Sequence, residues 1–169
     1  MVYDDRSSML RHFLAALAYR TQKAVRGAPA SFADFSAGGK TRTPRELVQH
    51  MTSVLGYART FFVGGTYRPD PLPEFDDEIE RFHEMLQSLS SHIENGDELL
   101  EGMTPERLLQ GPFSDAMTHA GQLAMLRRLE GSPVRPENFI VAKIDPSRLG
   151  SDQPDPVSPD KEWPEGPEN

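Results

Sequence analysis

The sequence predicts an all-α fold, a four-helix bundle followed by an extended, proline-rich, acidic C-terminal tail. Four long segments place apolar residues at the three-and-four spacing of one helical face. No alternating apolar segment of the kind typical of strands occurs before Phe139. Eight prolines follow residue 132 and exclude regular helix there. We therefore expect a bundle domain over residues 1–135 and an extended segment over residues 136–169, partly mobile, that packs on the bundle or on a neighbouring subunit.

The first predicted helix covers residues 5–25, where one face repeats every three or four residues. That face comprises Leu10, Phe13, Leu14, Leu17, Thr21 and Ala24. The loop that follows contains several glycines, and we expect Phe32 and Phe35 within it to pack against the core.

The second predicted helix begins at Pro44. The sequence Thr43-Pro44-Arg45-Glu46 is typical of a capping box with proline at the first helical position, which satisfies backbone donors at the helix start. Gly64-Gly65 ends this helix, because glycine readily adopts the left-handed backbone common just after a helix. The apolar face between these points comprises Leu47, Met51, Val54, Leu55, Ala58 and Phe61 or Phe62.

The third and fourth predicted helices follow an extended connection that contains three prolines between residues 69 and 73. The third helix has a heptad-like seam and ends near Asn95-Gly96. Its seam comprises Ile79, Phe82, Leu86, Leu89 and Ile93. A short helical turn capped by Thr104 precedes the fourth helix, which we expect to start with Pro112 at its first position and to end at Gly131.

Composition excludes several classes of function. The chain contains no cysteine, which rules out disulfides, thiolate metal sites, iron–sulfur clusters and a cysteine nucleophile. The net charge is −8, and residues 145–169 alone carry seven acids against two bases. Because the chain has no basic stripe, we expect neither DNA nor RNA as a partner.

Two features of the sequence argue against a membrane or secreted protein. The longest uninterrupted apolar run, Phe13 to Tyr19, has seven residues, whereas a membrane-spanning helix needs about 20. Asp4 and Asp5 stand where a secretory signal would carry positive charge, and no apolar stretch with a cleavage site follows. We therefore expect a cytoplasmic protein without a transmembrane segment.

Three side chains have the spacing of metal ligands. His50 falls among apolar residues on the inward face of the second predicted helix. Asp115 and His119 are four residues apart on the fourth predicted helix, so they lie one above the other on the same face. Two such donors and one from a facing helix supply three ligands and leave a position for water or substrate, as in catalytic metal sites.

The same spacing also has a purely structural explanation. An acid four residues before a histidine occurs a second time, in Glu46 and His50, where the capping box already accounts for the glutamate. A hydrogen-bonded cluster of Asp115, His119 and His50 without metal is therefore the alternative.

Candidate substrate-binding residues are His83, Gln122 and Tyr57, and no residue is assigned a catalytic role. His83 lies on the core seam of the third predicted helix, so it either bonds to a neighbour or lines the same cavity as the metal site. Glu80 and His83 have the spacing of a di-iron motif, but two such motifs are needed and only one is present. Gly39-Lys40-Thr41 is similar to the end of a phosphate-binding loop, but the first glycine and the preceding strand of such a loop are missing, so we expect no nucleotide site there.

Two stretches resemble the DinB/YfiT-like superfamily. They are Arg42-Thr43-Pro44-Arg45-Glu46-Leu47-Val48-Gln49-His50 and Asp115-x-x-x-His119-x-Gly121-Gln122-Leu123-x-x-Leu126-Arg127-Arg128. Residues 136–139 and 148–153 are similar to the same superfamily, and the likeness covers residues 5–159. It implies a four-helix bundle that binds a divalent metal, zinc or nickel, through one ligand from the second helix and two from the fourth.

The resemblance carries over to three positions. His50 matches the ligand of the second helix, and Asp115 and His119 match the two ligands of the fourth. Most members have histidine at the position of Asp115, and a carboxylate there is similar to the mycothiol-dependent maleylpyruvate isomerase branch. The family implies a transferase or isomerase that uses a low-molecular-weight thiol, such as bacillithiol or mycothiol, on a small-molecule substrate.

Two other functions stay open. Water activated by the same metal would give a hydrolase instead of a thiol-dependent enzyme. A non-catalytic bundle that binds a small molecule or a protein would need no metal at all. Under each of the three functions, the apolar surface of the helices and of residues 139–144 predicts a homodimer.

Overall fold

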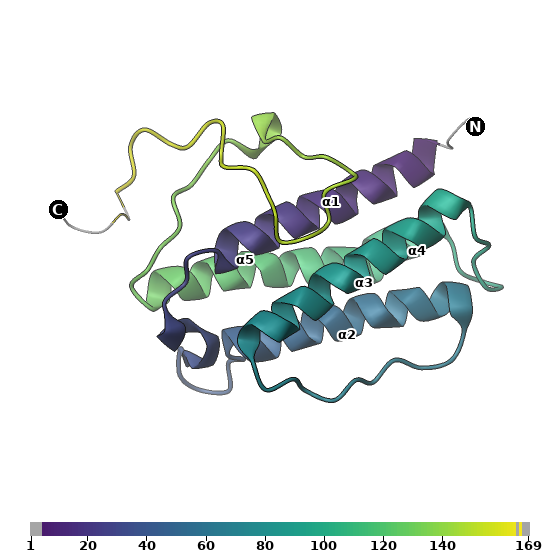
Figure 1. Cartoon of the computed structure of the whole chain (residues 1–169), viewed down its shortest axis with the longest axis horizontal. Helices are drawn as coiled ribbons and strands as arrows, with labels where there is room; N and C mark the ends of the chain where they lie inside the picture. Colours follow the sequence, from purple (N-terminus) through teal and green to yellow (C-terminus); the bar gives the residue numbers. More distant parts are fainter. Residues whose placement is uncertain (1–4, 165, 167–169) are drawn as a thin grey trace.

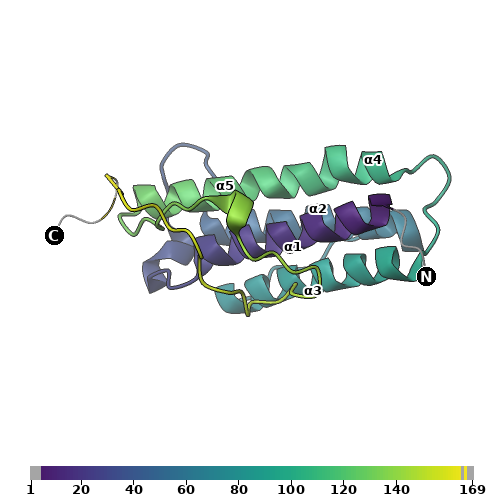
Figure 2. The same ribbon diagram turned by 90° about the horizontal axis from the view of Figure 1, so that it is seen from above.

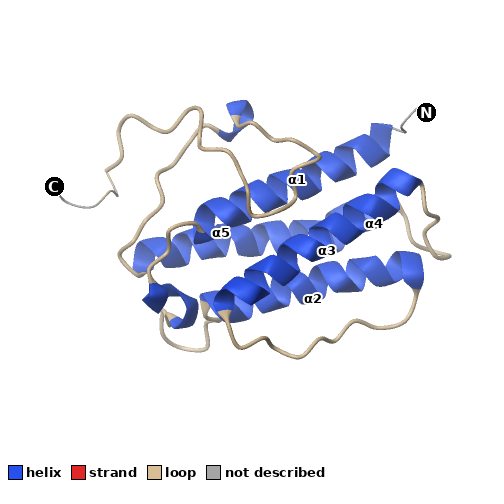
Figure 3. Ribbon diagram, in the orientation of Figure 1, coloured by secondary structure: helices blue, strands red, loops and turns tan. Residues whose placement is uncertain are grey.

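The computed structural model describes residues 5–164 and 166, and within them it contains helices and loops but no strand (Figures 1 and 3). The long helices are α1 (Asp5–Val25), α2 (Pro44–Val63), α3 (Phe75–Asn95) and α5 (Ser114–Leu129). The shorter elements are η1 (Ala30–Asp34), α4 (Pro105–Leu108), η2 (Leu109–Phe113) and η3 (Phe139–Val141). An isolated β-bridge joins Glu137 to Pro159. The predicted all-α class is confirmed.

The four long helices pack in a closed cycle, in which α1 and α2 each contact both α3 and α5 (Figure 2). Their apolar faces meet in one core, where Leu14, Leu55 and Phe82 are completely buried. Phe32 from η1 is also completely buried, and Phe35 packs against the core, as predicted. Burial of these apolar faces is the main source of stability for such a helical arrangement.

The start of α2 confirms the predicted capping box. The Thr43 hydroxyl accepts a hydrogen bond from the Glu46 amide at 3.3 Å, and the Thr43 amide donates to Glu46 Oε2 at 2.8 Å. Pro44 occupies the first helical position. Gly64 and Gly65 follow the helix with φ of 75° and 77°, which favours glycine. The boundaries of α2 thus follow directly from its sequence.

The helix α3 begins at Phe75, one turn before the first residue of its predicted seam. Asp76, Asp77 and Glu78 occupy its first turn, where negative charge interacts favourably with the helix dipole. The helix ends as predicted, with Gly96 in the left-handed conformation at φ 71°.

The predicted start of the fourth helix at Pro112 is wrong. Instead, α4, η2 and α5 run on without interruption, and Pro112 lies inside η2, a wide turn of the π-helical type. Proline cannot donate the backbone hydrogen bond of a helix interior, and its ring crowds the preceding turn. A π-turn relieves this crowding locally. The Ser114 hydroxyl also donates to the Leu109 carbonyl oxygen at 2.6 Å across the turn.

Beyond α5 the chain runs back along α1 in extended form and loops toward α3 (Figure 1). Glu137 anchors this segment: its side chain is fully buried and accepts hydrogen bonds from the Tyr19 hydroxyl at 3.0 Å and from Lys23 Nζ at 2.7 Å. Burial, together with the carboxylate of Glu137, raises the pKa of the Tyr19 hydroxyl far above its ordinary value. In the apolar piece after it, Phe139 packs edge-on against Tyr19, whereas Ile140 is 88% exposed.

His83 on α3 provides the second anchor of the tail. Its Nδ1 donates to the Leu149 carbonyl oxygen at 2.7 Å, and its Nε2 lies 3.1 Å from Gln22 Oε1. Burial lowers the pKa of His83, so the folded protein keeps this ring neutral at pH values where the unfolded chain binds a proton.

The low pKa of His83 makes stability depend on pH. The stabilisation is fully present above the unfolded-state pKa, about 6.5, and is lost as the pH falls toward the lower pKa of the folded protein. We expect the melting temperature of the wild type to fall between pH 7 and pH 5 by a few degrees more than that of His83→Gln. Thermal melts at both pH values test this, and equal falls would contradict it.

None of the helices in the described part of the chain combines the length and the hydropathy that a lipid bilayer would require.

Candidate metal centre

The first component of the centre is His50, two turns into α2 on the side that faces α5. The capping box fixes where α2 begins, and thereby the direction in which His50 points. The His50 side chain is about a third exposed, at 32%. It therefore borders the core yet remains accessible from outside.

The second component is the pair Asp115 and His119 on α5. The two residues are one helical turn apart, and Asp115 Oδ1 lies 3.6 Å from His119 Nε2. His119 is buried, and its Nδ1 donates a hydrogen bond to Gln122 Oε1 at 2.7 Å. This bond places the proton on Nδ1, so the lone pair on Nε2 is free to bind a metal, as in most histidine metal sites.

The two components converge. Asp115 Oδ2 lies 3.7 Å from His50 Nε2, and the imidazole rings of His50 and His119 meet edge-on with centroids 4.8 Å apart. One donor atom from each of the three residues lies within 4.8 Å of the other two. The short aspartate side chain thus reaches both histidines, one with each oxygen.

These distances are longer than hydrogen bonds, and the three donors could hold a metal ion. At 3.6 and 3.7 Å, Asp115 makes no proper hydrogen bond to either histidine. Donors about 2.1 Å from a tetrahedral ion are separated by roughly 3.4 Å, close to the two Asp115–histidine distances, while the full set of three donor atoms lies within 4.8 Å. Two imidazoles and a carboxylate are a donor set that zinc, nickel and other divalent ions accept. The residues therefore suit a divalent ion with a remaining open position.

The electrostatic surroundings keep His50 in the form that binds metal. Burial, then the positive charge of Arg42 and the neighbouring His119, lower the pKa of His50, although Asp115 acts in the opposite direction. A lowered pKa means a neutral imidazole at neutral pH, and only the neutral ring can donate its lone pair.

Two hollows open beside the centre. The larger one, which we call the His119 pocket, has a volume of about 480 Å³. It is lined by Lys40, Thr41, Arg42, Leu47, His119, Gln122, Met125 and Leu126. The smaller one has a volume of about 270 Å³ and reaches His50 between Gln49, Ser53 and Arg81. One hollow therefore gives access to His119 and the other to His50.

The candidate substrate-binding residues lie in different places. Gln122 lines the His119 pocket, as its sequence position suggests. His83 lines a separate hollow between α1, α3 and the tail, so the structure does not bring it together with the three donors. Tyr57 is two turns beyond His50 on α2, is 58% exposed and packs edge-on against Phe61. Seven residues of helix separate it from His50 by about 10 Å along the axis.

Sequence reasoning missed the positive charge at the centre. Lys40 and Arg42 line the His119 pocket, and neither forms a hydrogen bond or an ion pair with any residue that the structure describes. Both lie in the loop before α2, where no periodicity indicates which way a side chain points. The signal that could have found them is a pair of bases beside the capping box in an otherwise acidic chain.

Comparison of the chain with protein-family models, with curated proteins and with solved structures gives no match.

Proposed function

We propose that this chain is a divalent-metal-dependent enzyme, a thiol-dependent transferase or isomerase of the DinB/YfiT-like kind, and that its four long helices form the bundle of that superfamily. The metal ligands are His50, Asp115 and His119. One observation carries the proposal: the three donor atoms converge beside an open pocket without forming hydrogen bonds to one another.

The chain's own residues supply two functions around the ion. Gln122 holds the tautomer of His119, because its Oε1 accepts a hydrogen bond from the Nδ1–H group of the ring. Lys40 and Arg42 place positive charge along the His119 pocket, which favours an anionic substrate or co-substrate. When bound, zinc or nickel would stabilise the thiolate form of a coordinated thiol near neutral pH. With no cysteine of its own, the protein leaves that position to the thiol of a co-substrate.

The reaction that tests the proposal is substitution of an activated aryl chloride. The thiol gives up its proton, its sulfur forms a bond to the ring carbon, and the carbon–chlorine bond breaks to release chloride. We expect the zinc- or nickel-loaded protein to accelerate this reaction with bacillithiol or mycothiol. Asp115→Asn is expected to lose at least about 100-fold of the rate, whereas the exposed Asp152→Ala retains it.

Other results would point elsewhere. Turnover of ester or amide substrates without added thiol, dependent on the same residues, would replace the transferase by a hydrolase. A protein that binds one metal ion per chain but turns over neither substrate class, with thiol or without it, would count against an enzyme.

A further inference from the structure

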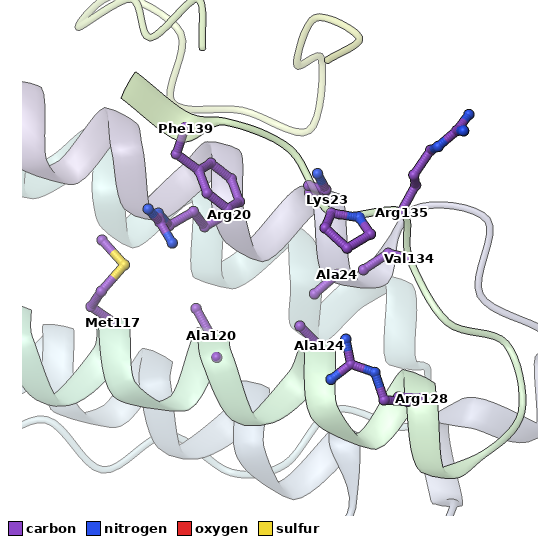
Figure 4. A pocket seen from close by; sticks show the side chains of 12 residues that line it. Arg20, Lys23, Ala24, Met117, Ala120, Ala124, Arg128, Val134, Arg135 and Phe139 are labelled. Atoms are coloured by element: carbon purple, nitrogen blue, oxygen red, sulfur yellow. The ribbon is translucent and has the colours of Figure 1, made fainter. Parts of the chain in front are cut away.

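A second candidate site lies between α1 and α5 under the segment that follows α5 (Figure 4). We call it the α1–α5 groove; its volume is about 200 Å³. Ala24, Ala120 and Ala124 form its floor, and Phe139 forms part of its wall. Gly121 also lines the groove. Small side chains on the floor leave an apolar hollow between two helices. A volume below the usual 300–1,000 Å³ of drug-sized sites indicates a small ligand.

The charge of the groove is opposite to that of the chain. The chain carries a net charge of −8, yet the residues lining the groove include four bases and no acid. Figure 4 shows Arg20 and Arg128 at opposite ends of the apolar floor, whereas Arg135 points away from it. Lys23 donates to the buried carboxylate of Glu137. The groove therefore combines an apolar floor with positive charge at its ends.

Arg20 is positioned to receive an anion. Its guanidinium lies against the face of Phe139, with Cζ 3.7 Å from the ring centroid. It makes no hydrogen bond or ion pair with any residue in the described part of the chain. Stacking on an aromatic ring holds the guanidinium plane in place and leaves its N–H groups available. Such a planar set of donors matches the two oxygens of a carboxylate.

We propose that the α1–α5 groove binds a small apolar carboxylate, with its hydrocarbon body on the alanine floor and its carboxylate on Arg20. The site is separate from the metal centre, because its α5 residues Ala120, Gly121 and Ala124 lie on the opposite side of that helix from Asp115 and His119. Binding at the groove therefore requires no metal and does not depend on the proposed enzymatic function.

Gly121 gives the sharpest test. A Cβ atom added there meets no other atom within 4 Å, and the residue has ordinary helical φ. Gly121→Leu should therefore place its Cβ without a clash, extend its side chain over the groove, and leave the melting temperature unchanged or raised, since glycine is a poor helix former. With metal-free protein, titration calorimetry with benzoate and octanoate is expected to show binding to the wild type and at least about 10-fold weaker binding to Gly121→Leu.

Two further comparisons separate the contributions of shape and charge. Arg20→Gln is expected to weaken benzoate binding at least about 10-fold, and benzamide, the uncharged analogue, is expected to bind the wild type at least about 10-fold more weakly than benzoate. Thr118→Leu, on the exposed side of α5 outside the groove, should bind benzoate like the wild type. No binding of either carboxylate up to about 10 mM, or equal binding by Gly121→Leu, would overturn the proposal.

Discussion

His119→Ala is expected to lose the divalent metal. The wild type, dialysed after exposure to zinc or nickel, should hold about one ion per chain, and the variant should bind at least about 100-fold more weakly. Loss of a group that merely orients a ligand already costs about 10–100-fold, and His119 is itself one of three proposed ligands. Elemental analysis and competition with a chromogenic chelator measure the stoichiometry and the affinity.

Two further variants distinguish loss of a metal ligand from loss of folded structure. Asp115→Asn changes a half-exposed side chain to one of the same shape, so it should weaken metal binding while the melting temperature stays the same. His12→Ala removes an exposed histidine of α1 and should bind metal like the wild type. Metal binding by folded His119→Ala with unchanged affinity would contradict the assigned ligands.

Arg127→Ala is expected to cause the largest loss of stability. Arg127 on α5 is only 5% exposed, yet it donates to three carbonyl oxygens at 2.9 to 3.1 Å, those of Ala24, Arg26 and Ser132. These bonds tie the end of α1 to the end of α5 and to the start of the tail. Removing the side chain leaves the carbonyl groups without their partner, at a cost of about 3 kcal/mol or more in the free energy of unfolding.

The neighbouring position provides a matched control. Arg128 is exposed, and its replacement by alanine should change the free energy of unfolding by less than about 1 kcal/mol. Arg127→Lys should recover only part of the loss, because a lysine ammonium cannot reach all three acceptors in the geometry of the guanidinium. Urea denaturation of the variants at one pH measures the differences. An Arg127→Ala protein as stable as Arg128→Ala would show that these bonds contribute little.

Local sequence signals predicted the helices well where one segment alone determines the structure. The capping box at Thr43 and the glycine pair at 64–65 fix both ends of α2 without help from the rest of the chain. The predicted start of α5 at Pro112 was wrong. Proline is common at the first position of a helix and rare in its interior, and here it occupies the rarer, interior position. Packing of the continuous helix against α1 and α2 decides between the two, and this is not a local property.

The candidate site also combines contacts within one helix with contacts between helices. The contact between Asp115 and His119 follows from their spacing on one helix, so it could be predicted from sequence. Their approach to His50 depends on how α2 packs against α5. The inward position of His50 suggested this approach, and the resemblance to a known superfamily supported it. His83 shows the limit of helical patterns, because an inward position does not tell which side of the core a residue faces. The predicted homodimer and the thiol co-substrate stay predictions.

The π-turn at η2 also has a consequence for the phase of the helix that contains it. A turn of this type holds one residue more than an α-helical turn, so every later side chain is rotated by about 100° relative to an uninterrupted α-helix. Asp115 lies only two residues after the end of η2. The extra residue therefore determines which side of α5 carries Asp115 and His119, and so their direction toward His50. The side chains of α4, which precedes the turn, are not rotated by it. The one-residue insertion thus lets α4 and α5 belong to one continuous helix and still present different faces to the helices packed against them.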